Sequence, residues 1–390
     1  MTKIKVLIID DSALIRQMLT KIINSTHDLE VVGVAADPYI ARDKIKRFNP
    51  DVLTLDVEMP RMDGLVFLKN LMRLRPMPVV MVSALTQKGA EITLQALELG
   101  AVDFISKPQI DIAQTFDSYS EEIISKIRVA AHAKIKPPKF FPQPALKVPP
   151  KYPPDVILTY KKRSHFKTTE KIIAIGASTG GTEAIKELLI QMPPHAPGIV
   201  ISQHIPAAFS YSFAMRMNQL SEMTVYEAED NKVILPGHVY IAPGGYHLLV
   251  ERSGTRYICR LHQGEPVNRH RPSVDVLFRS CAQNVGPNAI AAILTGMGDD
   301  GARGITEMHE VGAITIAQDE QTSVVWGMPG EAVKRGRIDY ILPLSKITSQ
   351  IISLTCESKT EKRGERRTLK GEREKKTTIA LYQTKKLNSQ

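Results

Sequence analysis

The stretch that decides the fold is KIIAIGASTGGTEAIKELL, residues 171–189. It opens with the apolar run 172–175, which stops at Gly176 and is followed by small residues and then by a helix-like pattern. This order predicts a buried strand, a tight turn and a helix. Ser178 lies on the turn, so the turn is a candidate for a nucleophile, a phosphate-binding loop or an ordinary glycine turn.

The spacing of the glycines separates these alternatives. Residues 176–180 match G-x-S-x-G, a pattern that exposes a serine hydroxyl on a sharp strand-to-helix turn. A dinucleotide loop needs G-x-G-x-x-G, and here Ser178 replaces the second glycine. A Walker loop would end in Gly-Lys-Ser/Thr, which this stretch lacks. Because backbone N–H groups at a helix start are free donors, a developing oxyanion would find partners there. The motif alone is moderately specific, since short patterns of small residues also arise by chance.

A nucleophilic serine needs a base and a group that orients the base. PGIVISQHIP (197–206) predicts a short buried strand with His204 at its carboxyl end. NAIAAILTGMGDDG (288–301) predicts another, which ends in a glycine-rich turn that holds Asp299 and Asp300. Parallel strands bring their carboxyl ends to one edge of a sheet, so we expect Ser178, His204 and one of these acids to lie together. The strand pattern leaves open which acid it is.

Both halves of the chain alternate strand-like apolar runs with helix-period segments, which predicts the α/β class. At 390 residues the chain is long enough for two domains. We expect two doubly wound parallel-sheet domains, flavodoxin-like over 1–125 and Rossmann-like over 170–356. A linker over 126–169, which is proline-rich and basic from 134, would join them. The charged segment 357–390 is expected to be a disordered tail.

The net charge of +10 does not by itself indicate a nucleic-acid surface. Residues 134–169 and 357–390 together carry +14, so the remainder of the chain carries about −4. We interpret the excess as solvated linker and tail, with no nucleic-acid partner. No stretch approaches the ~20 apolar residues of a membrane span, and acids directly follow the first apolar run. The three cysteines lack C-x-x-C spacing. We therefore expect a cytoplasmic protein that is not an integral membrane protein.

In the first half, polar residues gather where the predicted strands end. These residues are Asp10, Asp11, Asp56, Ser83 and Lys107. Clustered carboxylates repel one another unless a cation lies among them, and oxygen ligands suit Mg2+. A carboxylate beside Mg2+ and a lysine can accept a phosphoryl group, because both cations neutralise the developing charge. The strand ends therefore predict a phosphoacceptor site.

The segments VLIIDDS, LDVEMPRMDG, VSAL and FISKP make residues 1 to about 125 resemble a response-regulator receiver domain. The resemblance implies that a histidine kinase phosphorylates Asp56. It implies that Mg2+ is held by Asp11, Asp56 and the main-chain carbonyl of Glu58, with Asp10 acting through water. It also implies switch roles for Ser83, Phe104 and Lys107.

The segments GASTGGTEA, ISQHIP, APGGYH, HRPSVDVLF and ILTGMGDDGA resemble the catalytic domain of protein-glutamate methylesterase from bacterial chemotaxis. The resemblance implies that Ser178 is the nucleophile, His204 the general base and Asp300 the orienting acid, and that Thr179 and Met297 line the site. The family pattern G-M-G-x-D-G selects Asp300 over Asp299. The implied reaction hydrolyses glutamyl methyl esters on chemoreceptors to glutamate and methanol, with no cofactor, and extends to deamidation of receptor glutamines.

Together the two resemblances imply that phosphorylation of the receiver relieves a block on the esterase, in chains recruited to membrane receptor arrays. Two alternatives are a response regulator with a non-catalytic binding output and a DNA-binding regulator. The run of residues 269–273 is dense in cations beside a predicted helix start. It is either a contact for acidic receptor helices or a solvated helix entry. Cys281 lies on an apolar helix stripe and is expected in the core.

Overall fold

A computed structural model describes residues 3–57, 59, 64–83, 87–107, 116–133, 154–158 and 171–355. Residues 4–106 form a five-stranded parallel sheet in the order β2-β1-β3-β4-β5. Its strands are β1 (Ile4–Ile9), β2 (Leu29–Ala35), β3 (Val52–Asp56), β4 (Val79–Ser83) and β5 (Asp103–Ser106). The associated helices are α1 (Ala13–Asn24), α2 (Pro38–Phe48), α3 (Gly64–Leu74), α4 (Gln87–Glu98) and α5 (Phe116–His132). The predicted parallel α/β sheet of the first half is confirmed.

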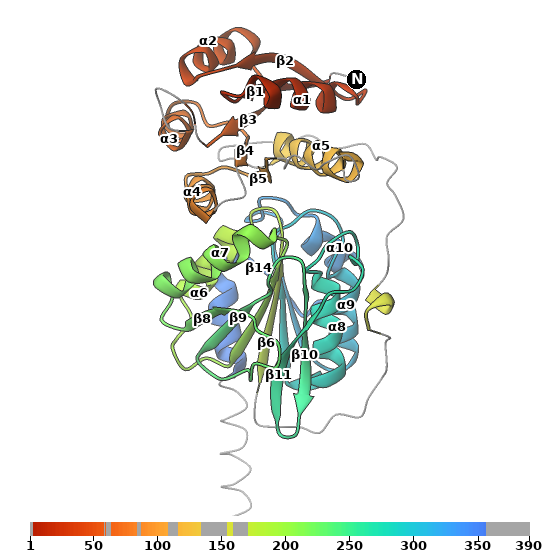
Figure 1. Ribbon diagram of the computed structural model, residues 1–390. Coiled ribbons are helices and arrows are strands. Elements are labelled where there is room, and N and C mark those ends of the chain that lie inside the picture. The colour runs from red at the N-terminus through yellow and green to blue at the C-terminus, as the bar shows by residue number, and fades with distance from the viewer. Residues whose placement is uncertain are drawn as a thin grey trace, which may run out of the picture. The chain divides into compact units, whose positions relative to one another are not determined.

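The second half forms a seven-stranded parallel sheet in the order β14-β13-β12-β6-β7-β9-β8. Its strands are β6 (Ile172–Ala177), β7 (Gly198–Gln203), β8 (Thr224–Glu227), β9 (His238–Ile241), β12 (Ala289–Ile293), β13 (Ile314–Gln318) and β14 (Tyr340–Leu342). Its labelled helices are α6 (Gly181–Ile190), α7 (Ala207–Leu220), α8 (Val274–Asn284), α9 (Ala302–Glu310) and α10 (Met328–Lys334), and the described residues 344–355 are also helical. Figure 1 shows α6 and α7 on one face of this sheet and α8 and α9 on the other.

The central strands are mostly apolar because helices cover both faces of the sheet, and the polar residues Ser202 and Gln203 at the end of β7 are also buried. Every residue of β6, β7 and β12 is buried. One element was not expected from the sequence: β10 (His247–Ser253) and β11 (Arg256–His262) pair as an antiparallel hairpin beside the main sheet. Several buried residues of this hairpin share a core with α8.

The order of the strands determines where a site can form. Strand β6 lies between β7 and β12, so the chain leaves β6 toward one side of the sheet and reaches β12 on the other. This is a topological switch point, where the carboxyl ends of parallel strands leave a crevice. In the register, Gly176 pairs with Ile293 on β12 and with Ser202 on β7. The residues that follow these strands therefore start from neighbouring positions.

Part of the predicted linker contacts the second domain. The short 3-10 turn η2 (Pro154–Val156) brings Asp155 to 2.9 Å from Arg279 of α8, whose side chain is fully buried. The Arg279 guanidinium also pairs with Glu307 of α9, and it donates to the carbonyl of Leu158 at 3.0 Å. Residues 154–158 are thus attached to the second domain. Residues 126–132, predicted as the start of the linker, belong to α5, and the remaining residues of 134–169 lie outside the described part of the chain.

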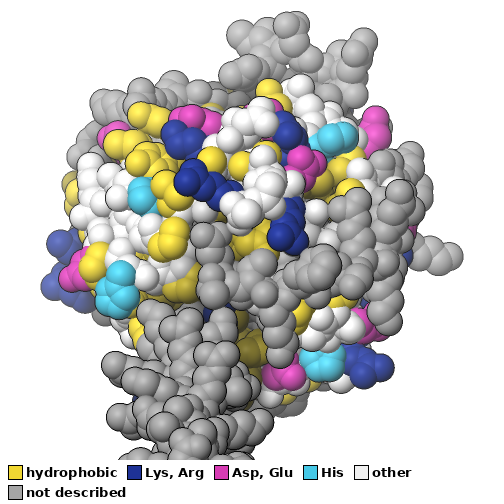
Figure 2. Space-filling model, turned by 90° about the horizontal axis from the view of Figure 1, so that it is seen from below, with side chains coloured by type: hydrophobic (Ala, Val, Ile, Leu, Met, Phe, Trp, Pro, Cys, Tyr) yellow, Lys and Arg dark blue, Asp and Glu magenta, His cyan; other side chains and the backbone are white. Residues whose placement is uncertain are grey.

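On the face shown in Figure 2, cationic, anionic and apolar side chains of the described residues are interspersed. Such mixing is typical of a solvated protein surface. Within the described ranges, no helix is both long and apolar enough to cross a bilayer.

Candidate functional site

The turn after β6 holds Ser178 at the switch point. Its backbone N–H donates to the carbonyl of Thr295 at 3.0 Å, and its own carbonyl accepts from Gly181 at 2.7 Å. The two glycines of the motif are required for different reasons. A Cβ on Gly176 would lie 2.1 Å from Val274 Cγ1, while Gly180 has φ +76°, which disfavours a side chain. Gly180 precedes α6 and offers no side-chain cap, so of the first-turn N–H groups of α6 that of Gly181 is used by the Ser178 carbonyl and those that follow it receive no cap from Gly180.

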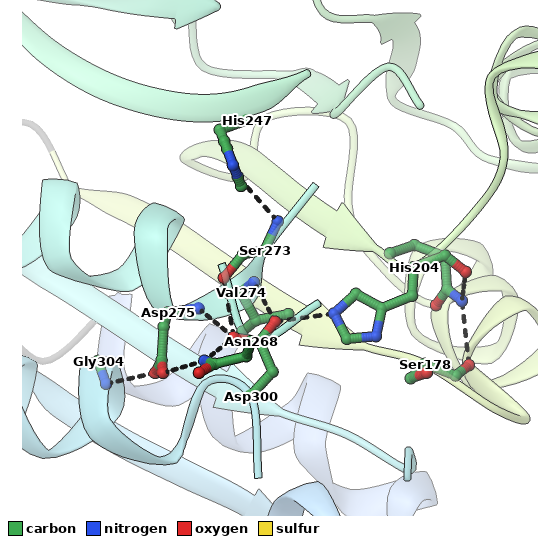
Figure 3. Close-up of polar contacts among 10 residues, drawn as sticks. Ser178, His204, His247, Asn268, Ser273, Val274, Asp275, Asp300 and Gly304 are labelled. Carbon is green, nitrogen blue, oxygen red and sulfur yellow. Dashed lines mark hydrogen bonds and ion pairs between the residues drawn. The ribbon is translucent and has the colours of Figure 1, made fainter. Parts of the chain in front are cut away.

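His204 and Asp300 form a buried pair at the same edge. His204 Nε2 lies 2.8 Å from Asp300 Oδ2, and the two side chains are 8% and 1% exposed. The other ring nitrogen, Nδ1, is buried and has no hydrogen-bond partner among the described residues. Figure 3 shows Nε2 directed at Asp300 and Nδ1 on the opposite edge of the ring, on the side of the view where Ser178 lies. The imidazole thus has one nitrogen oriented by the acid and one available.

Asp300 is held by the start of α8. Its carboxylate accepts from five groups besides any water: His204 Nε2, Asn268 Nδ2, Ser273 Oγ and the backbone N–H groups of Val274 and Asp275. Figure 3 shows these groups around the carboxylate. Burial alone would raise the pKa of Asp300, but the hydrogen bond and charge of His204, with the other donors, hold it below its usual range. The N-terminal end of a helix dipole also favours an anion. Asp300 therefore stays ionised although it is buried.

A second carboxyl group lies beside the first. Asp275 accepts from the Gly304 N–H at 2.7 Å and from Asn268 Nδ2 at 2.8 Å. Burial, and next the charge of Asp300, raise the pKa of Asp275 to about 7. Two neighbouring carboxyl groups whose pKa values are driven apart are a common feature of catalytic sites.

The run 269–273 lies at the entry to α8, and its histidine contacts the site. The rings of His270 and His204 stack with centroids 3.6 Å apart and an interplanar angle of 10°. Burial, and then the charge of His204, lower the pKa of His270 to about 3, so this ring is neutral at neutral pH. Arg271 donates to the carbonyl of Gly264 at 2.8 Å, and Arg269 is exposed. His270 of this run therefore packs against His204, so the run is more than a solvated helix entry.

The remaining residues expected in this site lie around it. Thr179 is buried; its carbonyl accepts from Thr295 Oγ1 and its hydroxyl donates to Asp103 Oδ2 at 2.7 Å. Met297, 39% exposed, lies on the turn between β12 and Asp300. Asp299 is half-buried, whereas Asp300 is the acid that contacts His204.

The carboxyl ends of β1 and β3 bring three acids together. Carboxylate oxygens of Asp10, Asp11 and Asp56 lie within 4.8 Å of one another. Lys107 Nζ is 2.7 Å from Asp56 and 3.4 Å from Asp10. Asp10 Oδ2 is buried and makes no hydrogen bond to the described residues. Burial raises the pKa of Asp10, against the opposing charge of Lys107. A cluster of carboxylate oxygens that includes the buried Asp10 Oδ2 fits a magnesium ion.

The switch residues lie beside this cluster. Ser83 is buried at the end of β4, and its hydroxyl donates to the carbonyl of Gly89 at 3.2 Å. Phe104 is buried on β5, with Lys126 Nζ 4.9 Å from its ring centroid. Glu58, expected to offer a main-chain ligand, lies outside the described residues.

Sequence reasoning did not find Asn268, Ser273 or Asp275 as neighbours of Asp300. The signal was present in the segment 268–275, which combines a cation-rich turn with a Ser-x-Asp helix start. The local pattern could not show that the start of α8 binds the Asp300 carboxylate, because Asp300 follows β12, a different part of the chain.

Known proteins match both halves. Residues 173–351 match the family described as CheB methylesterase, and residues 6–116 match the response regulator receiver domain. A protein-glutamate methylesterase/protein-glutamine glutaminase of Hydrogenovibrio crunogenus is 57% identical over 373 residues, which are 91% of this chain and 99% of the relative. This chain belongs to the CheB family. Its functional class is therefore a methylesterase/glutaminase response regulator of chemotaxis adaptation.

Two further CheB proteins are also similar to this chain. An enzyme of the same name from Geobacter metallireducens is 59% identical over 348 residues, covering 89% of this chain and 95% of the relative. The crystal structure of the Thermotoga maritima CheB methylesterase catalytic domain is 40% identical and covers 47% of this chain and 98% of that one, with a TM-score of 0.47. The acidic cluster of this CheB is typical of the Mg2+ site of receiver domains.

Proposed function

We propose that Ser178, His204 and Asp300 are the catalytic triad of this esterase, in the roles of nucleophile, general base and orienting acid. The observation that carries the proposal is the buried 2.8 Å contact between His204 and Asp300 at the strand end beside Ser178. A base fixed by an ionised acid on one nitrogen can take a proton on the other. Since Nε2 faces Asp300, the proposed base atom is Nδ1.

The proposed reaction follows acyl transfer. The Ser178 oxygen attacks the carbonyl carbon of a glutamyl methyl ester while His204 Nδ1 takes the hydroxyl proton. The tetrahedral oxyanion is stabilised by N–H groups at the start of α6. The C–O bond to the methoxy group breaks as His204 returns the proton, and methanol leaves. Water, deprotonated by His204, then cleaves the acyl-serine to glutamate. A glutamine side chain would release ammonia by the same steps.

In the receiver half we propose Asp56 as the phosphorylated residue, with a chemotaxis histidine kinase as donor. Asp10, Asp11 and Asp56 would hold Mg2+, which supplies positive charge to the incoming phosphoryl oxygens. Lys107 adds a second positive charge at 2.7 Å from Asp56. Ser83 and Phe104, at the ends of the neighbouring strands, are proposed to respond to the new phosphoryl group.

We further propose that the unphosphorylated receiver restrains the esterase. Contacts between the two halves support this idea. Glu98 of α4 pairs with Arg216 of α7 and lies 3.1 Å from Lys186 of α6. Asp103 of β5 accepts from the hydroxyl of Thr179, the residue after the proposed nucleophile. Phosphorylation at the opposite end of β5, beside Lys107, would shift the population away from these contacts.

The proposed substrates are chemoreceptors on the cytoplasmic side of membrane arrays. Residues 126–132 of the predicted linker belong to α5, and the proline-rich part that begins at 134 is proposed to let the halves separate while staying tethered. The test measures methanol release from methyl-esterified receptor membranes, with and without a small phosphodonor and Mg2+. Wild type is compared with Ser178→Ala and Asp56→Asn. Release should rise with the donor in wild type, vanish in Ser178→Ala and ignore the donor in Asp56→Asn.

Release that persists in Ser178→Ala would contradict the triad. Release that rises with the donor in Asp56→Asn would contradict the phosphorylation site and leave the triad untouched. Wild-type release that ignores the donor would contradict the restraint.

A further inference from the structure

The turn before α8 has an unusual backbone. Val267 and His270 form a two-way backbone bridge, at 3.1 and 2.9 Å, around the two residues Asn268 and Arg269. Both have positive φ, +50° and +74°. Such values at both central residues are those of a type I′ turn, in which asparagine is tolerated and arginine is strained. Strained non-glycine residues of this kind cluster at functional sites.

The side chain of Asn268 connects the two buried carboxyl groups. Its Nδ2 lies 2.8 Å from Asp300 Oδ1 and 2.8 Å from Asp275 Oδ2. A primary amide nitrogen carries two N–H groups, so one can serve each acid. Because a carboxylate acceptor lies on each side of Nδ2, only one orientation of the Asn268 amide allows it to donate to both acids. Figure 3 shows Asn268 between Asp275 and Asp300, with His204 on the far side of Asp300.

We infer that Asn268 is a positioning residue for the esterase: its amide fixes the Asp300 carboxylate that orients His204, and it separates that carboxylate from Asp275. The inference rests on the proposed triad. Asn268 would not touch the substrate. It donates a neutral hydrogen bond to an ion, which stabilises the ion without neutralising it. It thereby limits how strongly Asp300 retains a proton on His204.

The charged and titratable groups around this amide set the expected direction of a pH effect. They are Asp275 and Asp300 in direct contact, His204 and His270 beyond Asp300, His247 behind Ser273, Glu307 near Asp275, and Arg269, Arg271 and Lys126 farther out. Removing a donor from Asp300 leaves its negative charge less balanced, so the imidazolium of His204 is favoured. The acid limb of kcat/KM would therefore move to higher pH.

Two substitutions in the full chain test this role. Asn268→Gly removes the amide while allowing φ +50°, so the turn carries no added strain. Asn268→Asp keeps the size and replaces a donor with a third carboxyl group. The matched control is Asn284→Asp at the other end of α8, where the amide donates to the carbonyls of Val250 and Ser280. Methanol release is measured from pH 5.5 to 9 together with thermal melting, and Ser178→Ala serves as the reference.

We expect kcat to fall about tenfold to a hundredfold in both Asn268 variants, with little change in KM, because a hydrogen bond to a buried ion is lost. The acid limb should move to higher pH, more so in Asn268→Asp. Asn284→Asp should melt earlier with an unmoved acid limb. An unmoved limb in both Asn268 variants, with Ser178→Ala inactive, would overturn the inference and keep the triad. Activity in Ser178→Ala would show instead that the triad itself is wrong.

Discussion

At the scale of single residues, the site separates two buried acids by giving them different partners. Asp300 receives a charged or polar donor on every side, whereas Asp275 has one backbone N–H and the Asn268 amide. The pKa of Asp275, raised by burial and then by Asp300 to about 7, is well above that of an aspartate in an unfolded chain. The native state therefore binds a proton that the unfolded chain releases near pH 4.

This difference predicts how stability changes with pH. Between about pH 4 and 7 the folded protein retains a proton on Asp275 that the unfolded chain lacks, so this residue stabilises at low pH and the contribution is lost as pH rises. The free energy of unfolding of wild type minus that of Asp275→Asn should fall across this window, by on the order of a few kcal/mol. Denaturant unfolding at several pH values measures it.

Asp319→Asn, in a half-buried turn of the same domain, is the control, because the Asp319 carboxylate accepts from the backbone N–H and the hydroxyl of Thr322. Its difference from wild type should not show the fall over pH 4 to 7. A flat difference for Asp275→Asn would mean that Asp275 is ionised throughout and that Asn268 bridges two anions.

The sequence could predict only some of these residues. Ser178, His204 and an acid at 299 or 300 were expected to meet, since each follows a strand and parallel strands end at one edge. Strand periodicity could not separate Asp299 from Asp300, because the choice depends on which side of one turn faces His204. Asn268 was missed because it reaches Asp300 through a turn whose geometry depends on two positive φ values.

At the scale of elements, the site depends on how closely β6 approaches α8. A Cβ on Gly176 would lie 2.1 Å from Val274 Cγ1, and the N–H of Val274 donates to Asp300 at 2.7 Å. Gly176→Ala should therefore push the start of α8 away from the sheet. We expect a loss of about 1–3 kcal/mol in stability and a fall in kcat, measured by denaturant unfolding and methanol release.

Gly198→Ala is the matched control, since its Cβ would lie 2.5 Å from Ile234 Cγ2 at the amino end of β7. It should lose stability by overpacking while keeping kcat. The double variant Gly176→Ala with Val274→Ala should recover part of the lost activity, since the clashing methyl group is gone. A kcat loss equal in Gly176→Ala and Gly198→Ala would show that general destabilisation, not movement of α8, lowers the activity.

The sequence predicted those strands whose burial produces a recognisable run of apolar residues. The strand runs recognised in the sequence are mostly apolar, and every residue of β3, β4, β7 and β12 is buried, as expected of strands covered on both faces. The hairpin of β10 and β11 was not expected, because more than half of its residues are exposed or half-buried and its pairing is antiparallel. Its place beside α8 is set by tertiary packing.

At the scale of the whole molecule, one carboxylate of the receiver contacts two cations of the esterase. Glu98 accepts from Arg216 Nε at 2.8 Å and lies 3.1 Å from Lys186. Burial would raise the pKa of Glu98, but the hydrogen bonds from Arg216 and Lys186 lower it, so the group is ionised at neutral pH. Neither cation belongs to the proposed triad. The contact can therefore be weakened without altering the chemistry.

Glu98→Gln should release part of the restraint. Loss of an ion pair of this exposure is worth up to about 1 kcal/mol, so the rate without phosphodonor should rise about two- to fivefold. The rate with phosphodonor should not change, because the contact is already broken in that state. Methanol release by the full chain, with and without donor, measures both.

Glu91→Gln, exposed on the same helix, is the control. Glu98→Arg combined with Arg216→Glu should restore the low basal rate, whereas an unchanged basal rate in Glu98→Gln would show that this ion pair does not hold the restrained state.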